Sequence, residues 1–239
     1  NIYGFCLYYY WFSGRRLLEK PLDIFMQIES EFPFCVCWAN ENWTRRWDGR
    51  ENDVLMAQSY TDADMDNFIR DVIPILQRPN YITVNGKKML LVYRSELIPD
   101  PQKWTDHWRS VAMNHGIDLH LVRAESFTCD DPRSHGFDAS YEFPPLFYAR
   151  NDITEQMAPS TKMKVYEYAS MVRWGHERRP TSYPLYAGVC PSWDNTPRRG
   201  NRAHIMHGST PDLFKAWLKK AFSRTSDGIV FCNAWNEWG

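Results

Sequence analysis

A glutamate close to the last residue is the first candidate for chemistry. Glu237 lies in the segment NAWNEWG (233–239), with an indole on either side, directly after the apolar run 228–234. A short run of apolar and β-branched residues predicts a strand that is buried on both faces, so Glu237 is expected where this strand ends. A carboxylate between aromatic rings at that position is a candidate catalytic acid. The alternative is a carboxylate that pairs with a nearby arginine for structural reasons.

Polar and aromatic side chains also follow the other predicted strands. They are Tyr9, Tyr10 and Trp11; Trp38, Asn40 and Glu41; Tyr93 and Arg94; Glu125; Glu142; Trp193, Asp194 and Asn195; and Asn236 and Trp238 beside Glu237. In parallel α/β barrels, functional residues project from the carboxyl ends of strands, where the loops converge. Pyranose rings stack their C–H faces on aromatic rings and bond their hydroxyls to carboxylates and amides. The set therefore predicts a binding site for an oligosaccharide or polysaccharide.

Several of these features have plainer interpretations. Packing against helices is the preferred explanation for Trp104, Trp108 and Trp217, and rings of the run 8–10 alternate between the two faces of a strand. Glu142, which precedes Phe143 and two prolines, could be a loop residue without function.

Two basic segments leave a phosphate-binding interpretation open. Arg45-Arg46 and Arg198-Arg199 with Arg202 could hold the phosphates of a nucleotide sugar, or could pair with Asp48 and Asp194. The chain has no G-x-x-x-x-G-K-[ST], G-x-G-x-x-G or G-x-S-x-G motif. The common phosphate loops, dinucleotide sites and nucleophile-elbow hydrolases are therefore disfavoured.

Seven predicted strands alternate with helical segments, which is typical of a parallel α/β fold. The strands are expected at 2–10, 34–38, 89–93, 119–124, 136–141, 185–190 and 228–234, and helices at 17–28, 65–73, 101–116, 164–174 and 211–222. Asn85-Gly86 predicts a hairpin turn before the third strand. Seven strands are one short of eight, so we expect a single-domain (β/α)₈ TIM-type barrel over 1–239, truncated at both ends.

Composition limits the remaining classes. The chain has 239 residues, 44% of them apolar, and a net charge of −1, which favours one large core and neither nucleic acid nor an anionic membrane surface as partner. No apolar tract is long enough for membrane insertion. Six cysteines without a C-x-x-C pair predict reduced core thiols and a cytoplasmic setting, while a leader before Asn1 stays an open alternative. Seven histidines lack metal-ligand spacing, so no metal is expected.

Four motifs taken together carry a family resemblance. They are GFCLYYYWF (4–12), CWANENWTRRWDG (37–49), WDNTPRR (193–199) and NAWNEW (233–238). With these motifs the chain resembles, essentially from end to end, the WbsX-like family, which has been called a glycosyltransferase family and is similar to glycoside hydrolase family 99, the endo-α-mannosidases.

The resemblance implies a barrel with two glutamates in an N-E-W-x-E arrangement on its last strand. Glu237 matches the first and would deprotonate the 2-hydroxyl of the sugar, giving a 1,2-anhydro intermediate in a retaining hydrolase. The second glutamate would fall just past Gly239, and a further strand and helix would precede Asn1. No metal or organic cofactor is required.

Three hypotheses follow for the function. In the first, a retaining hydrolase acts on α-linked, mannose-type glycans. Its substrate would be held by Tyr9, Tyr10, Trp38, Asn40, Glu41, Tyr93, Arg94, Trp193, Asp194, Asn195, Asn236 and Trp238. In the second, a glycosyltransferase of surface polysaccharide assembly binds a nucleotide or lipid-phosphate donor near Arg198 and Arg199. The third is a glycan-binding module without turnover.

Overall fold

A computed structural model describes all residues except 1, 46–49, 147, 179 and 236–239. The chain divides into two compact units, each of which is described by itself. The first comprises residues 1–43 and 55–140, and the second comprises 44–54 and 141–239.

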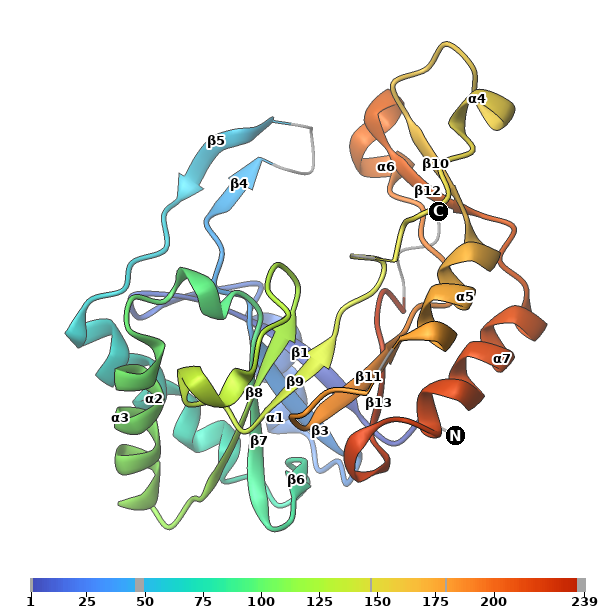
Figure 1. Cartoon of the computed structure of the whole chain (residues 1–239). Helices are drawn as coiled ribbons and strands as arrows, with labels where there is room; N and C mark the ends of the chain where they lie inside the picture. Colours follow the sequence, from blue (N-terminus) through green and yellow to red (C-terminus); the bar gives the residue numbers. More distant parts are fainter. Residues whose placement is uncertain (1, 46–49, 147, 179, 236–239) are drawn as a thin grey trace. The chain divides into compact units, whose positions relative to one another are not determined.

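The first unit is built on a mostly parallel sheet with the strand order β2-β1-β3-β7-β8 (Figure 1). These strands are β1 Phe5–Phe12, β2 Arg15–Leu17, β3 Phe34–Trp38, β7 Lys87–Val92 and β8 Leu119–Glu125, and β6 Thr83–Val84 pairs with β7. The pairs β1/β3, β3/β7 and β7/β8 are parallel, whereas β1/β2 and β6/β7 are antiparallel. All five residues of β3 are buried, as predicted for a strand that is covered on both faces.

Capping residues mark where the longer helices of the first unit begin. They are α1 Lys20–Gln27, α2 Asp62–Leu76 and α3 Pro101–Met113, with single 3₁₀ turns η2 Ser95–Leu97 and η3 Pro132–His135. Thr61 caps α2 by accepting a hydrogen bond from the Asp64 amide, and the Asp64 carboxylate accepts one from the Thr61 amide in return. Asp100 caps α3, and Pro101 occupies the first turn, where its missing N–H costs nothing.

Aromatic packing fixes α2 and α3 on the sheet. Trp38 stacks on Phe68 of α2 with ring centroids 4.3 Å apart and on Trp104 of α3 at 5.9 Å. Trp108 of α3 is fully buried and donates from its indole N–H to the Met65 carbonyl at 3.0 Å. The prediction that Trp104 and Trp108 are packing residues is confirmed.

In the second unit, β11 Leu185–Val189 pairs in parallel with β13 Val230–Cys232. β9 Ala139–Glu142, whose last two residues belong to this unit, lies next to β11 in the strand order. A second small sheet pairs β10 Lys164–Glu167 with β12 His204–His207. β4 Trp43–Arg45 pairs with β5 Arg50–Met56, and the outer ends of this pair, Trp43 and residues 55–56, belong to the first unit. The helices are α4 Thr154–Met157, α5 Tyr168–Glu177, α6 Thr196–Arg199 and α7 Pro211–Phe222, with 3₁₀ turns η4 Gly200–Arg202 and η5 Ser226–Gly228.

All seven predicted core strands are present, as β1, β3, β7, β8, β9, β11 and β13, and they neighbour one another in chain order. The fold is therefore a mixed α/β fold. Among the described residues, β2 pairs with β1 in the first unit and β13 pairs with β11 in the second.

Two helix predictions need correction. The segment 17–28 starts as β2, which pairs antiparallel with β1, and the helix begins only at Lys20. The segment 164–174 starts as β10, because Val165 packs into the core while its backbone pairs with Ile205 of β12. The six cysteines are free thiols as expected, although Cys6, Cys129 and Cys232 are exposed rather than in the core.

A buried carboxylate ties the helices of the second unit to its sheet. Glu142 is fully buried, and its two carboxylate oxygens each accept a 2.6 Å hydrogen bond from Arg224, which follows α7. Arg178, at the end of α5, approaches the same carboxylate at 3.0 Å, and the Gly188 amide donates to it at 2.8 Å. A Cβ at Gly188 would lie 2.4 Å from the Glu142 carbonyl oxygen, so only glycine fits there. Glu142 is thus a strand residue in an ion pair, not a loop residue.

Glu142→Gln is expected to lower the free energy of unfolding by about 3–5 kcal/mol, because it leaves two guanidinium groups without their buried counter-ion. Urea unfolding of both proteins measures this loss. Glu167→Gln is the matched control, because the Glu167–Arg173 pair at 2.8 Å is partly exposed and should contribute no more than about 1 kcal/mol. Equal losses in the two variants would contradict the assignment.

Candidate functional site

Four aromatic side chains form a continuous surface on one face of the first unit's sheet. Tyr8 and Tyr10 project from the same face of β1, with ring centroids 5.8 Å apart. Tyr93, just after β7, lies 6.4 Å from Tyr8, and Trp43 meets Tyr10 edge-on at 5.2 Å. We call this set the aromatic face. Tyr8 is 44% exposed and the other three side chains are half-buried, so part of this surface is open to a ligand.

A charged cluster follows the carboxyl ends of β3 and β7. The guanidinium of Arg94 contacts the carboxylates of both Glu41 and Glu96, and it lies over the Phe127 ring at 3.6 Å from the centroid. We call Glu41, Arg94 and Glu96 the charged cluster. Burial acts to lower the pKa of Arg94, but the carboxylates of Glu96 and Glu41 outweigh it, so the pKa is raised. All three side chains keep about a fifth of their surface exposed.

Asn40 positions this cluster instead of contacting a ligand. Its amide is fully buried, donates to the Arg94 carbonyl at 2.7 Å and accepts from the Arg94 amide at 2.8 Å. The Tyr60 hydroxyl donates to the Asn40 carbonyl at 2.7 Å, and burial raises the pKa of Tyr60 so that this phenol stays neutral. The expectation that Asn40 binds a sugar hydroxyl is therefore corrected, because both ends of its amide are occupied within the protein.

Tyr9 and Trp38 are also placed differently from the prediction. Tyr9 is 2% exposed and packs against Phe68 of α2 at 6.2 Å, and Trp38 is fully buried between the sheet and the helices. Both point toward the helical side because side chains alternate along a strand, so neither forms a wall of the site.

Sequence reasoning missed Tyr8, Trp43, Glu96 and Phe127 as members of the site. Alternation along β1 would have placed Tyr8 with Tyr10, because residues two apart share a face. Phe127 follows the end of β8 and Glu96 follows Arg94. Both residues therefore lie just after the carboxyl end of a strand, which is the criterion that selected Arg94 in the sequence.

The predicted residues Trp193, Asp194 and Asn195 lie in the second unit, where they shape a turn. The Asp194 carboxylate accepts a hydrogen bond from the Thr196 amide at 2.8 Å, which opens the short helix α6. The Asn195 side chain accepts one from the His204 amide at 2.7 Å, and Trp193 lies 5.8 Å below the guanidinium of Arg198. Asn236, Glu237 and Trp238 lie outside the described residues. The structure thus brings together Tyr10 and Tyr93, and Glu41 and Arg94, in the first unit.

Phosphate binding was left open for two basic segments, and the arginines of these segments that the structure describes have interaction partners: Arg45, Arg198, Arg199 and Arg202. Arg45 lies 3.7 Å from Asp53, and Arg46 and Asp48 lie outside the described residues. Within the described ranges, no group of three or more histidine, cysteine or acidic side chains is arranged to hold a metal ion. No helix there combines the length and apolar character that crossing a membrane requires.

The rings and carboxylates at these strand ends together supply apolar ring faces and hydrogen-bond acceptors for a ligand. A family comparison makes this specific: the chain belongs to the family described as Glycosyltransferase WbsX, whose model matches residues 1–239. It is 38% identical over 246 residues to the "Uncharacterized protein WxcX" of two Xanthomonas campestris pv. campestris strains, B100 and ATCC 33913. The match covers 98% of this chain and 35% of each relative, so the chain spans about a third of their length.

Solved structures resemble it in fold. A "Glycoside hydrolase-like protein" superposes with a TM-score of 0.56 at 14% identity, covering 86% of this chain and 62% of that one. Two structures of the GH99 endo-α-mannosidase from Bacteroides thetaiotaomicron give TM-scores of 0.51 and 0.52 at 14% and 15% identity. Each covers 96% of this chain, and 64% and 61% of the mannosidase. At these identities the likeness extends to the fold.

Asn40→Ala is expected to lower the free energy of unfolding by about 2 kcal/mol, because it leaves the N–H and carbonyl of half-buried Arg94 without these partners. Urea denaturation measures the loss. Asn42→Ala serves as the control, because exposed Asn42 accepts one hydrogen bond from the Gln58 amide and should cost less than about 1 kcal/mol. A neutral Asn40→Ala would exclude the positioning role.

Proposed function

We propose that this chain is the barrel-type domain of a carbohydrate-active enzyme that acts on α-linked, mannose-type sugars of an oligosaccharide or surface polysaccharide. The observation that carries the proposal is the aromatic face at the carboxyl ends of β1 and β7, beside the charged cluster of Glu41, Arg94 and Glu96. Membership of the WbsX family and the likeness in fold to glycoside hydrolases support it. In this proposal residues 1–239 form a single domain.

The aromatic face and the charged cluster would contact different parts of a sugar. Rings such as Tyr10 and Trp43 offer apolar surface to the C–H face of a pyranose. Glu41 and Glu96 offer carboxylate oxygens to hydroxyls, and Arg94 holds both carboxylates in place while its own N–H groups are directed at them. Binding by neutral stacking and hydroxyl contacts requires neither a metal nor an organic cofactor.

Catalysis is proposed for Glu237 on the strength of its motif. In a retaining mechanism assisted by the substrate, this carboxylate would take the proton of the sugar's 2-hydroxyl, and that oxygen would displace the leaving group to give a 1,2-anhydro sugar. A second carboxylic acid must protonate the leaving oxygen, and ordinary retaining hydrolysis likewise needs a pair of carboxyl groups. The resemblance to glycoside hydrolase family 99 implies that this partner would follow Gly239.

Glu237→Gln in the full-length protein is expected to reduce turnover of a mannosyl oligosaccharide by about 10²-fold or more, because the base is lost. Product formation measured by chromatography tests this. Glu155→Gln, a change outside the motif, should retain wild-type turnover. Unchanged turnover in Glu237→Gln would remove the residue from the mechanism.

Glycosyl transfer is the second candidate, favoured by the description of the family. It requires a nucleotide or lipid-phosphate donor, so titration of the full-length protein with nucleotide sugars separates it from hydrolysis. A binding module without turnover would hold glycans equally in wild type and Glu237→Gln, with no product from either protein.

Tyr10→Ala and Trp43→Ala are each expected to weaken glycan affinity about 5–10-fold, because an aromatic contact beyond area burial contributes about 0.5–1.5 kcal/mol. Calorimetric titration of the full-length protein with a short mannan measures this. Tyr3→Ala is the control, because Tyr3 is 74% exposed and precedes β1 at its amino end. An equal effect of all three changes would count against the aromatic face.

A further inference from the structure

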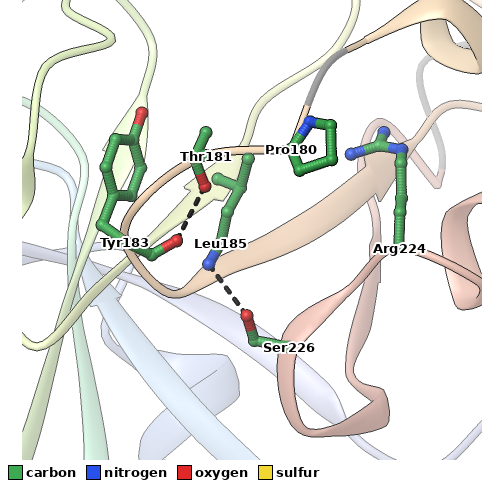
Figure 2. Close-up of a pocket in the computed structure, with 6 residues that line it drawn as sticks. All are labelled: Pro180, Thr181, Tyr183, Leu185, Arg224 and Ser226. Atoms are coloured by element: carbon green, nitrogen blue, oxygen red, sulfur yellow. Dashed lines mark hydrogen bonds between the residues drawn. The ribbon is translucent and has the colours of Figure 1, made fainter.

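The second unit contains a small cavity of about 90 Å³ at the amino end of β11. It is lined by Pro180, Thr181, Tyr183, Leu185, Arg224 and Ser226 (Figure 2). Two lining hydroxyls bond within the lining: Thr181 donates to the Tyr183 carbonyl at 2.7 Å, and Ser226 accepts from the Leu185 amide at 3.0 Å. Small-molecule pockets commonly measure about 300–1,000 Å³, so this cavity is too small for a sugar ring. The charge preference for a bound sugar is therefore sought at the aromatic face and the charged cluster of the first unit.

The charged cluster carries more negative than positive charge. Arg94 supplies one positive charge and contacts one carboxylate oxygen of Glu41 and one of Glu96, which supply two negative charges. The three groups therefore have a formal charge of −1. The second oxygen of Glu96 has no hydrogen-bond partner among the described residues, and this side chain keeps 23% of its surface exposed. Glu96 can therefore accept a hydrogen bond from a ligand without releasing Arg94.

Other charged groups of the segments that follow these strands do not reverse the sign. Three cations there each have an acidic partner: Arg45 with Asp53, Arg123 with Asp130, and Arg133 with Asp131. Arg15, at the start of β2, is an exposed cation, and Glu125, at the end of β8, is a buried carboxylate, so their formal charges cancel. Among these described groups, the excess negative charge is that of the cluster itself.

The rings of the aromatic face favour the same sign of ligand charge. Tyr93 immediately precedes Arg94 in the chain, and its ring lies 6.4 Å from that of Tyr8. Trp43 follows Glu41 by two residues and meets the edge of the Tyr10 ring. The face of an aromatic ring is negative, so it attracts a cation and repels an anion. Rings and carboxylates therefore act together in favour of a positively charged group.

We propose that the sugar bound at the aromatic face carries a protonated amine, and that Glu96 is the residue that selects it. The inference rests on the proposed function, because it names the charge class of the glycan for the same site. The ammonium would donate a charge-assisted hydrogen bond to Glu96 while the C–H face of the sugar stacks on the rings. A sugar acid would instead place a like charge beside two carboxylates that Arg94 holds in position. An amine at a carbon other than C2 leaves the 2-hydroxyl for the proposed catalysis.

NMR titration of the full-length protein at pH 7 with three methyl α-glycosides that differ only at C6 tests the proposal. They are the glycosides of mannose, 6-amino-6-deoxymannose and mannuronic acid. The amine is expected to bind about 5-fold more tightly than the mannoside, and the acid about 5-fold more weakly, which is the upper range for a partly exposed ion pair. Both differences should shrink at about 1 M salt, where the screening length falls to about 3 Å.

Glu96→Gln should bring the three affinities within about 2-fold of one another, because the excess charge of the cluster is removed. Glu31→Gln is the matched control: it removes the same charge from an exposed residue before the amino end of β3, and should leave the order unchanged. An unchanged order in Glu96→Gln would remove this residue as the selector, and if the variant does not fold, the wild-type order and its salt dependence decide. Equal affinities in the wild type, or tighter binding of the acid, would overturn the amine preference alone. Binding of none of the three glycosides would overturn the proposed function and this inference with it.

Discussion

The alternation of side chains along parallel strands is the constraint on which the first unit depends. In β1, Tyr9 and Trp11 face α2, while Tyr8 and Tyr10 face the opposite side. The parallel register extends this division to β3, where Tyr8 pairs with Cys37 and Tyr9 pairs with Trp38. One aromatic set therefore stabilises the fold and the other is left for a ligand. A slip of one residue would exchange the two sets, so the same register that builds the core also builds the aromatic face.

Rigidity at the strand ends comes from side chains that replace backbone partners. After β7 the Tyr93 amide still donates to the Trp38 carbonyl at 3.0 Å, and at the next residue the side-chain amide of Asn40 bonds both the N–H and the carbonyl of Arg94. Arg94 in turn fixes Glu41 and Glu96, so one buried amide positions three charged groups. An isolated surface ion pair contributes little stability. The cluster is better understood as a way to hold carboxylate oxygens in fixed directions, at the cost of the side-chain entropy of three long residues.

The sequence predicted the seven core strands because apolar runs such as FCVCW at 34–38 are local signals that tertiary contacts reinforce. It missed two strands for different reasons. β2 pairs with β1 across a tight turn at Ser13 and Gly14, and this turn was not recognised in the sequence. β10 pairs with β12, His204–His207, which lies forty residues further along the chain, so no local signal reveals the pairing. In the site, the expectation that functional residues follow strand ends correctly selected Glu41, Tyr93 and Arg94. It does not say which face of the sheet a ring occupies. The two-residue alternation along β1 would have placed Tyr8 in the site instead of Tyr9.

In the second unit, an arginine follows the carboxyl end of each of two helices, and both arginines reach the sheet. Arg178 and Arg224 follow α5 and α7, where cations are favoured by the helix dipoles, and Glu142 draws both to one strand. Burial of a carboxylate requires partners on both oxygens, and the Gly188 amide adds a further donor. One carboxylate can use only one edge of Arg224, however. The Nε on the second edge is left buried without an acceptor among the described residues, a cost that the buried ion pair with Glu142 has to offset.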